Sequence, residues 1–398
     1  MKASITVEQA IEYMEEHVHT VESESVPILR SIGRILSQDV IARVSQPPFD
    51  RSPLDGYAVR AADISGASPK TPVILQVVDK LYAGENAAFS VGTRQAIRLM
   101  TGSMIPEGAD SVIRQEDTDE GEELVQVYAP CKGNICYRGE DFREGSLLLP
   151  TGTRIDAAAV TVAASSGLTD LVVFRKVRTA ILSIGDELLQ PGKPLLPGKI
   201  YDSNRCYLAS RLEQLGTEAV RTGTVGDDLD EIVGFLRNAC KTADLVITTG
   251  GVSVGQKDLV EKALGALGAD IIFHGISMKP GMPTLFAVKD GTPILGLSGI
   301  PFSAAVAFEL LVHPVLAKMA HDGVLRQKTL VAVAANGFAK GSPSRRFLRG
   351  IFEDGAVTIP AAQSNGQMKA MVGCNCLVDI PAGTGELKPG DRIKVILI

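Results

Sequence analysis

The sequence predicts a multidomain α/β plus β protein, and three observations support this fold class. At about 150 residues per domain, 398 residues indicate two or three domains. Between residues 177 and 326, short apolar runs alternate with helical periodicity, which is typical of a doubly wound parallel sheet. Residues 70–155 and the stretch from Gln327 onward instead alternate β-branched runs with Gly and Pro turns. These stretches predict a β-rich lobe and a small C-terminal β-barrel.

The first element is an amphipathic helix over residues 6–17. Apolar side chains recur at 7, 10, 11, 14 and 18, and Thr6 and Gln9 have the spacing of a capping box. Further along, the segment 46–57 holds three prolines and two aspartates, so it can be neither a helix nor a central strand. We expect a shaped loop there.

The α/β region is predicted element by element from its periodicity. A buried strand is expected at 177–184 and further strands at 218–225 and 244–249, with shorter strands near Ile271, Leu285 and Ile294. Helices are expected at 204–215, 229–242 and 258–267. A last helix starts at Phe302, and Pro314 is expected to kink or end it.

Composition excludes several classes of function. A net charge of −6 and a pI near 5.5 lack the basic face that nucleic acid binding requires. The N-terminus turns acidic at once and has no apolar segment of a secretory signal. The longest uncharged run, 292–308, is interrupted by Gly and Pro, so we expect no membrane span and a cytoplasmic protein. Six cysteines without a Cys-x-x-Cys pair favour reduced thiols over a zinc site.

Polar residues follow four of the predicted strands. They occur at 185–187, 226–228, 250–255 and 297–299. Each alone is more often a turn or a helix cap than a site. Because ligands of open parallel sheets bind beyond the carboxyl ends of the strands, the four together predict a site on one rim.

The loop 249–255, Thr-Gly-Gly-Val-Ser-Val-Gly, lies between a strand and a helix, where backbone N–H groups bind phosphate. It matches neither a Walker A loop nor Gly-x-Gly-x-x-Gly. Glu187, Asp227 and Asp258 would crowd negative charge beside a phosphate, an arrangement that Mg²⁺ stabilises. This predicts a metal-assisted phosphate reaction, whereas the alternative for each carboxylate is a solvated cap.

Two cationic segments are candidates for binding an oxyanion. Lys279 lies on the rigid turn Lys-Pro-Gly-Met-Pro, where it either contacts an anion or is an exposed loop lysine. The segment 344–349 carries three arginines that either bind an anion or lie in solvent.

Several long motifs, taken in order, resemble one family: the molybdopterin molybdenumtransferases, similar to the C-terminal domain of gephyrin. The resemblance extends over essentially the whole chain. The motifs that carry it are 47–59 (PPFDRSPLDGYAV), 96–102 (AIRLMTG), 138–141 (RGED), 183–188 (SIGDEL), 200–204 (IYDSN), 250–255 (GGVSVG) and 278–281 (MKPG).

The resemblance implies an elongated homodimer with a site shared between the α/β domain of one subunit and the β-rich lobe of the other. The resemblance also implies the domain boundaries. An N-terminal helix at 1–20 packs on the α/β domain, and a central linking domain consists of 21–45 and 143–175. The inserted β-rich lobe is 46–142, the α/β molybdopterin-binding domain 176–326 and the C-terminal β-barrel 327–398.

The resemblance also implies the chemistry. Adenylylated molybdopterin binds, its dithiolene takes up molybdenum from molybdate, and Mg²⁺-dependent cleavage of the pyrophosphate releases AMP. The residues implied as catalytic are Asp55, Thr101, Glu187, Asp227 and Asp258, of which the last three also hold the metal. Those implied for substrate binding are Gly250, Gly251, Ser253, Gly255, Lys279, Ser298, Pro301 and Arg349. Transient contacts with the molybdopterin adenylyltransferase and with recipient molybdoenzymes would follow.

The sequence departs from the family pattern at two positions. Met282 replaces the second lysine of Lys-Pro-Gly-Lys-Pro, and Ile300 replaces the asparagine of Pro-Gly-Asn-Pro. These departures leave two alternatives to the molybdate insertase: a divergent paralogue that carries molybdopterin without efficient turnover, and an insertase specific for tungstate.

Overall fold

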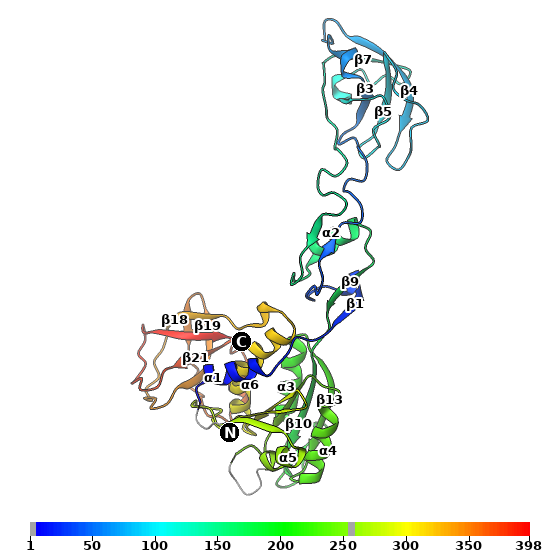
Figure 1. Cartoon of the computed structure of the whole chain (residues 1–398). Coiled ribbons are helices and arrows are strands. Elements are labelled where there is room, and N and C mark those ends of the chain that lie inside the picture. Colours follow the sequence, from blue (N-terminus) through cyan, green and yellow to red (C-terminus); the bar gives the residue numbers. More distant parts are fainter. Residues whose placement is uncertain (1–4, 254–258) are drawn as a thin grey trace. The chain divides into compact units, whose positions relative to one another are not determined.

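A computed structural model describes residues 5–253 and 259–398 of the chain (Figure 1). The chain forms two compact units. One consists of Met1–Glu24 with Phe174–Ile398, and the other is Ser25–Val173. The finer division into five segments stays a prediction.

The unit Ser25–Val173 contains a small helical part and a β-rich lobe. In the first part, β2 (Val40–Ile41) pairs with β8 (Leu147–Leu149), and α2 (Ala157–Ser165) is capped by Asp156. Three short 3₁₀ helices lie in this unit: η1 (Ile28–Arg30), η2 (Ala61–Ile64) and η3 (Gln115–Asp117). The strands β1 (Ser23–Pro27) and β9 (Asp170–Phe174) pair with each other where the two units meet in the sequence.

The β-rich lobe is built on a five-stranded sheet in the order β6-β3-β5-β4-β7. One core cluster of the lobe holds Tyr57, Leu75, Ile113 and Val125, and a second cluster holds the alternate residues Ala58 and Val112 of β3 and β6. The strands are β3 (Gly56–Val59), β4 (Val73–Leu81), β5 (Gln95–Leu99), β6 (Ser111–Arg114) and β7 (Leu124–Val127).

The N-terminal helix α1 (Val7–Glu16) forms as its sequence predicts. The Thr6 hydroxyl accepts a hydrogen bond from the Gln9 N–H, and the Gln9 side chain accepts one from the Thr6 N–H, so the capping box is complete. Val7, Ala10 and Met14 are buried in the same core cluster as helix α6, against which α1 packs.

The α/β sheet has six strands in the order β13-β10-β14-β17-β16-β15. The first four are parallel to one another, whereas β16 runs antiparallel to both of its neighbours, β17 and β15, so the prediction of a parallel sheet is wrong at this strand. The reason is a two-residue Asp290-Gly291 turn, which has positive φ at both positions and joins β16 to β17 as a hairpin. The strands are β10 (Arg178–Ile184), β13 (Glu218–Val225), β14 (Leu245–Thr249), β15 (Asp270–His274), β16 (Leu285–Lys289) and β17 (Thr292–Leu297).

Helices cover both faces of this sheet. One core cluster joins α1, α3 (Ser203–Gln214) and α6 (Pro301–Met319) to side chains such as Ile181 and Ile247. A second cluster joins α4 (Leu229–Ala239) and α5 (Val260–Leu267) to alternate residues of the same strands, such as Leu182 and Val246. The doubly wound α/β class is therefore confirmed. A short pair, β11 (Leu188–Leu189) with β12 (Ile200–Tyr201), precedes α3.

Helix α6 runs through Pro314 and continues to Met319, so the proline does not end it. Nearly all of its side chains are buried in the central cluster, and this burial outweighs the hydrogen bond that proline removes. By length and composition α6 is apolar enough to span a membrane, but 94% of that window is buried inside the fold. This is the pattern of a core helix.

The C-terminal part is a closed barrel in the order β18-β20-β19-β21-β22, which confirms the predicted barrel. Phe347, Leu377 and Ile396 of the barrel belong to the same core cluster as α6, so the barrel packs directly on the α/β part. Its strands are β18 (Thr329–Ala334), β19 (Arg346–Glu353), β20 (Ala356–Thr358), β21 (Cys376–Ile380) and β22 (Arg392–Leu397), with η4 (Gly323–Leu325) before it and η5 (Met368–Met371) within it.

Candidate functional site

An acidic cavity of about 800 Å³ lies at the carboxyl ends of the four parallel strands. Its walls include Glu187 after β10, Asp227 after β13, Gly250 after β14 and Ser298 after β17. The four polar segments predicted to share a rim are therefore brought together, as the rule for ligand sites in parallel sheets requires. We call this space the acidic cavity, because its charged lining among the described residues is Glu187, Asp202 and Asp227.

The floor of the acidic cavity is formed by a close approach of two loops. Gly250 has φ +91°, and a Cβ there would collide with the Ile184 carbonyl oxygen. A Cβ on Gly299 would lie 3.4 Å from the Gly250 Cα. Only glycine at 250 satisfies both the backbone angle and the contact. Gly251 and Ser253 also line the cavity.

Helix α3 fixes these loops from its N-terminus. The Asn204 side-chain amide donates to the Thr249 hydroxyl at 2.9 Å and to the Gly299 carbonyl at 2.8 Å. Asp202 caps α3 and accepts hydrogen bonds from the hydroxyls of Ser183 on β10 (2.9 Å) and Thr224 on β13 (2.7 Å). This buried carboxylate ties the helix to two strands, which makes it a positioning group.

The two described carboxylates of the predicted metal set line the same cavity. Glu187 is exposed, and Asp227 is half-buried with its N–H donating to Asp186 Oδ1 at 3.0 Å. Within residues 5–253 and 259–398, no group of three or more His, Cys, Asp or Glu side chains is placed to hold a metal ion. Asp258, the third predicted ligand, and Gly255 lie outside the described residues.

A second cavity, of about 790 Å³, adjoins the first and shares Pro283, Ser298 and Ile300 with it. Its charged lining in the described part of the chain is Lys279, Lys340 and Arg346, with no carboxylate. We call it the basic cavity. Oppositely charged compartments therefore meet at the turn after β17.

The basic cavity is lined by residues of both the α/β part and the barrel. The Lys279 N–H donates to the Arg345 carbonyl at 2.9 Å, and the Phe347 N–H donates to the Lys279 carbonyl at 2.8 Å. These backbone bonds fix the Lys279 turn against the start of β19, while its side chain remains exposed. The two substituted residues also line this cavity: Met282 is 57% exposed and Ile300 is 49% exposed.

Arg349, predicted to bind substrate, lies outside both cavities. Only 1% of the residue is exposed, and its guanidinium stacks on the Phe302 ring at 3.6 Å from the centroid. Its Nη1 donates to the Ala362 carbonyl at 3.2 Å and its Nη2 to the Ser364 carbonyl at 3.0 Å. Burial lowers the pKa of Arg349. Arg346, on the same strand, is the arginine that lines the basic cavity.

Asp55 and Thr101 form a pair in the β-rich lobe. The Thr101 hydroxyl and N–H each donate to Asp55 Oδ1 at 2.7 Å. The hydroxyl hydrogen bond, supported by that of the N–H, holds the pKa of Asp55 below its usual range. The predicted pair thus presents an ionised carboxylate.

Sequence reasoning missed three residues that shape the site. Asn204 is the last residue of the motif 200–204, but an asparagine at this position does not by itself indicate hydrogen bonds to two loops. Lys340 and Arg346 line the basic cavity; Arg346 lies in the arginine segment 344–349 that was a candidate for anion binding, but Arg349 was the residue named from it. Its neighbour Arg345 instead pairs with Asp379 and Glu8.

Three family models match the chain in order along its length. The MoeA N-terminal region (domain I and II) matches residues 5–167, and a probable molybdopterin binding domain matches residues 180–318. The MoeA C-terminal region (domain IV) matches residues 331–398. With the fold described above, these matches define the class: an enzyme of molybdenum cofactor biosynthesis.

Full-length relatives narrow this class to one family. A molybdopterin molybdenumtransferase of Staphylococcus aureus (strain MRSA252) is 34% identical over 399 residues, covering 99% of this chain and 95% of that protein. One from Bacillus subtilis (strain 168) is 34% identical over 407 residues, covering 100% and 95%. The chain belongs to the molybdopterin molybdenumtransferase family and is a transferase, as the motifs predict.

Solved structures agree with this assignment. The crystal structure of a molybdopterin biosynthesis MoeA protein from Pyrococcus horikoshii superposes with a TM-score of 0.88 at 31% identity, covering 99% of both chains. A second from the same organism gives a TM-score of 0.79 at 27% identity, covering 99% of this chain and all of that one. The predicted multidomain fold class is confirmed.

Proposed function

We propose that this protein inserts molybdate into adenylylated molybdopterin and releases AMP with the help of Mg²⁺. The observation that carries the proposal is the pair of adjoining cavities of opposite charge at the carboxyl ends of the parallel strands. Adenylylated molybdopterin joins an adenylyl pyrophosphate to a dithiolene that accepts the metal. Each of these two parts needs its own binding compartment. The two cavities share the turn that contains Ser298, so one molecule can reach both.

The acidic cavity binds the adenylyl and phosphate part. The N–H groups of Gly251 and Ser253 face phosphate oxygens, which are favoured at a strand-to-helix loop. The Gly250 N–H donates to the Leu297 carbonyl at 3.0 Å, so Gly250 contributes its lack of a side chain rather than a donor. Glu187 and Asp227 fit Mg²⁺, which is commonly held by one or two carboxylates together with substrate phosphates. Bound Mg²⁺ would supply charge neutralisation at the phosphoanhydride bond that is cleaved. Asp258 and Gly255 belong to the same proposed set.

The basic cavity binds the oxyanion. Molybdate carries two negative charges, and three cations without an opposing carboxylate in the described lining attract such an ion. Lys279 and Ser298 both line this cavity, while Pro301, the first residue of α6, lines the acidic cavity. Arg349 contributes indirectly, because its guanidinium holds the loop at 362–364 that forms one wall.

We also propose that the working form is a homodimer, in which Asp55 and Thr101 of one subunit complete the site of the other. Support comes from their chemistry: the Thr101 hydroxyl and N–H hold Asp55 as an ionised, oriented carboxylate. The exposed apolar side chains of Leu29, Ile32 and Ile41 offer the kind of surface that subunits cover.

The proposed compartment and partners follow from the same function. We propose a cytoplasmic protein with a small-molecule substrate, without nucleic acid or membrane partners. Transient contact with the molybdopterin adenylyltransferase and with recipient molybdoenzymes would protect an unstable intermediate during transfer.

The test is to incubate the purified protein with adenylylated molybdopterin, Mg²⁺ and molybdate, and to measure AMP and metallated cofactor. Glu187→Gln should abolish Mg²⁺-dependent AMP release while the circular dichroism spectrum stays unchanged. Glu213→Gln, a matched change of an exposed carboxylate on α3 outside both cavities, should leave activity intact. Full AMP release by Glu187→Gln would remove this residue from the metal site.

One observation keeps the alternatives open. Met282 and Ile300 place exposed apolar side chains on the basic cavity, where the family pattern has a lysine and an asparagine. This change favours weaker oxyanion binding, as expected for a divergent paralogue that carries molybdopterin. Running the same assay with tungstate beside molybdate separates the second alternative, since a tungstate-specific insertase would form cofactor only with tungstate.

A further inference from the structure

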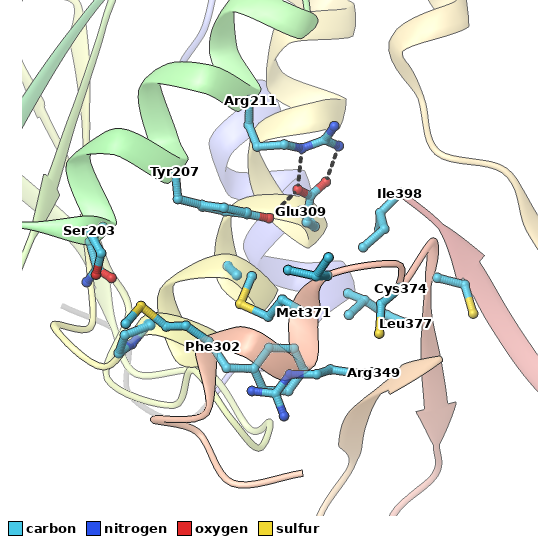
Figure 2. A pocket seen from close by; sticks show the side chains of 16 residues that line it. Ser203, Tyr207, Arg211, Phe302, Glu309, Arg349, Met371, Cys374, Leu377 and Ile398 are labelled. Atoms are coloured by element: carbon cyan, nitrogen blue, oxygen red, sulfur yellow. Dashed lines mark hydrogen bonds and ion pairs between the residues drawn. The ribbon is translucent and has the colours of Figure 1, made fainter. Parts of the chain in front are cut away.

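A third pocket, which shares Phe302 with the basic cavity, is lined by residues of helices α3 and α6 and of the barrel (Figure 2). Its volume of about 380 Å³ is at the lower end of the range for small-molecule sites. Most of its wall is apolar, with Phe302, Met371 and Leu377 among the side chains that line it. We call it the apolar pocket.

One end of the apolar pocket is a closed ionic network. Figure 2 shows Arg211 and Tyr207 of α3 pointing toward Glu309 of α6. Glu309 Oε1 accepts from the Tyr207 hydroxyl and from Arg211 Nε, both at 2.7 Å, and Oε2 accepts from Arg211 Nη2 at 2.8 Å. His313 Nε2 lies 2.9 Å from Oε2. Each carboxylate oxygen therefore has two partners, and this end offers no spare acceptor for a cationic ligand.

The opposite end holds an unused donor. Arg349 is 99% buried, and both of its Nη atoms donate to carbonyls of the 362–364 loop. Its Nε is buried as well, but has no hydrogen-bond partner in the described part of the protein. A buried donor without a partner is rare, because it has lost its water without a replacement. A ligand that accepts a hydrogen bond there would restore the missing interaction.

From these two ends and the apolar wall between them, we propose that the apolar pocket binds a small, flat, largely apolar organic acid. Its carboxylate accepts from Arg349 Nε, and its ring lies among Phe302, Met371 and Leu377. The size of the pocket suits one or two fused rings. The inference does not depend on the proposed insertase reaction, because Arg349, Met371 and Leu377 line neither of the two cavities, and Phe302 lines the basic cavity without a polar group to offer its substrate.

The pocket nevertheless shares Ser203, Asn204, Pro301 and Met368 with the acidic cavity. Asn204 is the residue that holds the two loops of that cavity together. A ligand in the apolar pocket would therefore contact a residue that also lines the acidic cavity. We expect its binding to change the affinity of the acidic cavity for the nucleotide. This coupling gives the pocket a regulatory use.

The test uses two probes of similar shape, 2-naphthoate and 2-ethylnaphthalene, titrated into the full-length protein and followed by calorimetry. We expect saturable binding of 2-naphthoate that is at least tenfold tighter than that of 2-ethylnaphthalene, since a charged hydrogen bond contributes about that factor or more. In Arg349→Lys, which keeps the charge but lacks Nε, the difference between the probes should shrink.

A second variant protects the test against misfolding of Arg349→Lys. Cys374→Phe places a ring inside the pocket and should abolish binding of 2-naphthoate, while Cys206→Phe, on the exposed side of α3 and outside the pocket, should leave it unchanged. Equal affinity for the two probes, no saturable binding, or binding that survives Cys374→Phe in the folded protein would each overturn the proposal.

Discussion

Asn204 and Thr249 are joined by a 2.9 Å hydrogen bond from the asparagine amide to the threonine hydroxyl, which connects the start of α3 to the end of β14. The Thr249 hydroxyl in turn donates to the Ser298 carbonyl at 2.9 Å. Together with the bond from Asn204 to Gly299, these contacts tie the loops after β14 and β17 into one floor for the acidic cavity. The shape of the cavity therefore depends on one amide.

Asn204→Asp is expected to weaken AMP binding by tenfold or more. The substitution turns a donor into a charged acceptor opposite the Gly299 carbonyl, and the resulting repulsion moves the loop that faces the phosphate. Isothermal titration with AMP and Mg²⁺ measures the effect. Asn238→Asp is the matched control, because Asn238 also donates to a backbone carbonyl, but on α4 away from the cavity. Equal losses in the two variants would contradict the proposed role.

Glu309 makes folding stability depend on pH. Burial raises its pKa, but hydrogen bonds from His313 and Arg211 outweigh burial and lower it to about 2, from 4.5. A lowered pKa contributes stability above the unfolded pKa and loses it as the pH falls through the folded one. The free energy of unfolding should thus fall by about 3 kcal/mol between pH 4.5 and 2 from this group.

Denaturant unfolding at several pH values checks the Glu309 prediction. Glu309→Gln should be less stable by about 3 kcal/mol at pH 7, because the half-buried Arg211 loses its charged partner, and the pH dependence of this step should vanish. Glu12→Gln, on the exposed face of α1, should keep the wild-type profile. An unchanged slope in Glu309→Gln would assign the acid sensitivity to other groups.

The capping box of α1 is expected to stabilise the unit that contains it. Thr6→Ala removes the acceptor for the Gln9 N–H and should lower the free energy of unfolding by about 1 kcal/mol. Thr6→Ser keeps the hydroxyl and should cost much less. Identical midpoints for the alanine and wild-type proteins in urea would show that packing against α6 alone holds the helix.

Subunit mixing tests the proposed shared site. Asp55→Ala and Glu187→Gln should each be inactive as homodimers. Mixed under conditions that exchange subunits, they should regain up to about a quarter of wild-type activity, because half of the molecules are heterodimers with one intact site of two. Exchange is followed by native mass spectrometry. Complete exchange without recovered AMP release would place Asp55 and Glu187 in the site of the same subunit.

Met282→Lys with Ile300→Asn is expected to lower the molybdate concentration needed for half-maximal cofactor formation by about ten- to hundredfold. Both side chains line the basic cavity, and a restored charged hydrogen bond contributes about 1.5–3 kcal/mol. Leu195→Lys, an exposed apolar residue outside that cavity, controls for added charge. An unchanged molybdate requirement in the double variant would mean that the anion binds elsewhere.

The sequence was most informative where local signals and burial agree. The Thr6 capping box and the strand Leu245–Thr249 were predicted to the residue or nearly so, because their sequence pattern matches their environment. The antiparallel strand β16 was not predicted, although Asp290-Gly291 is a strong hairpin signal. The alternation of strands with helices along the rest of this region favoured a parallel sheet instead. Pro314 was expected to disturb α6, but the surrounding core overrides its local effect.

The residues that line the acidic cavity could be predicted from the sequence better than those that line the basic cavity. Carboxylates such as Glu187 follow strands, so sheet topology alone brings them to one rim. The basic cavity instead joins two parts of the chain, and no periodicity reveals that Arg346 faces Lys279 while Arg349 turns inward onto Phe302. Such contacts between domains are set by packing, which a single sequence does not display.

Helix α6 has a consequence for how the chain is made on the ribosome. The strands that cover one side of it are synthesised before it, but Phe347, Leu377 and Ile396, which cover another side, come later. About 80 residues separate the end of α6 from Ile396. At a synthesis rate of roughly 5–20 residues per second, the apolar surface of α6 therefore stays uncovered for on the order of ten seconds before the barrel is complete. Nascent chains that stop before residue 396 should therefore be the species that chaperones retain.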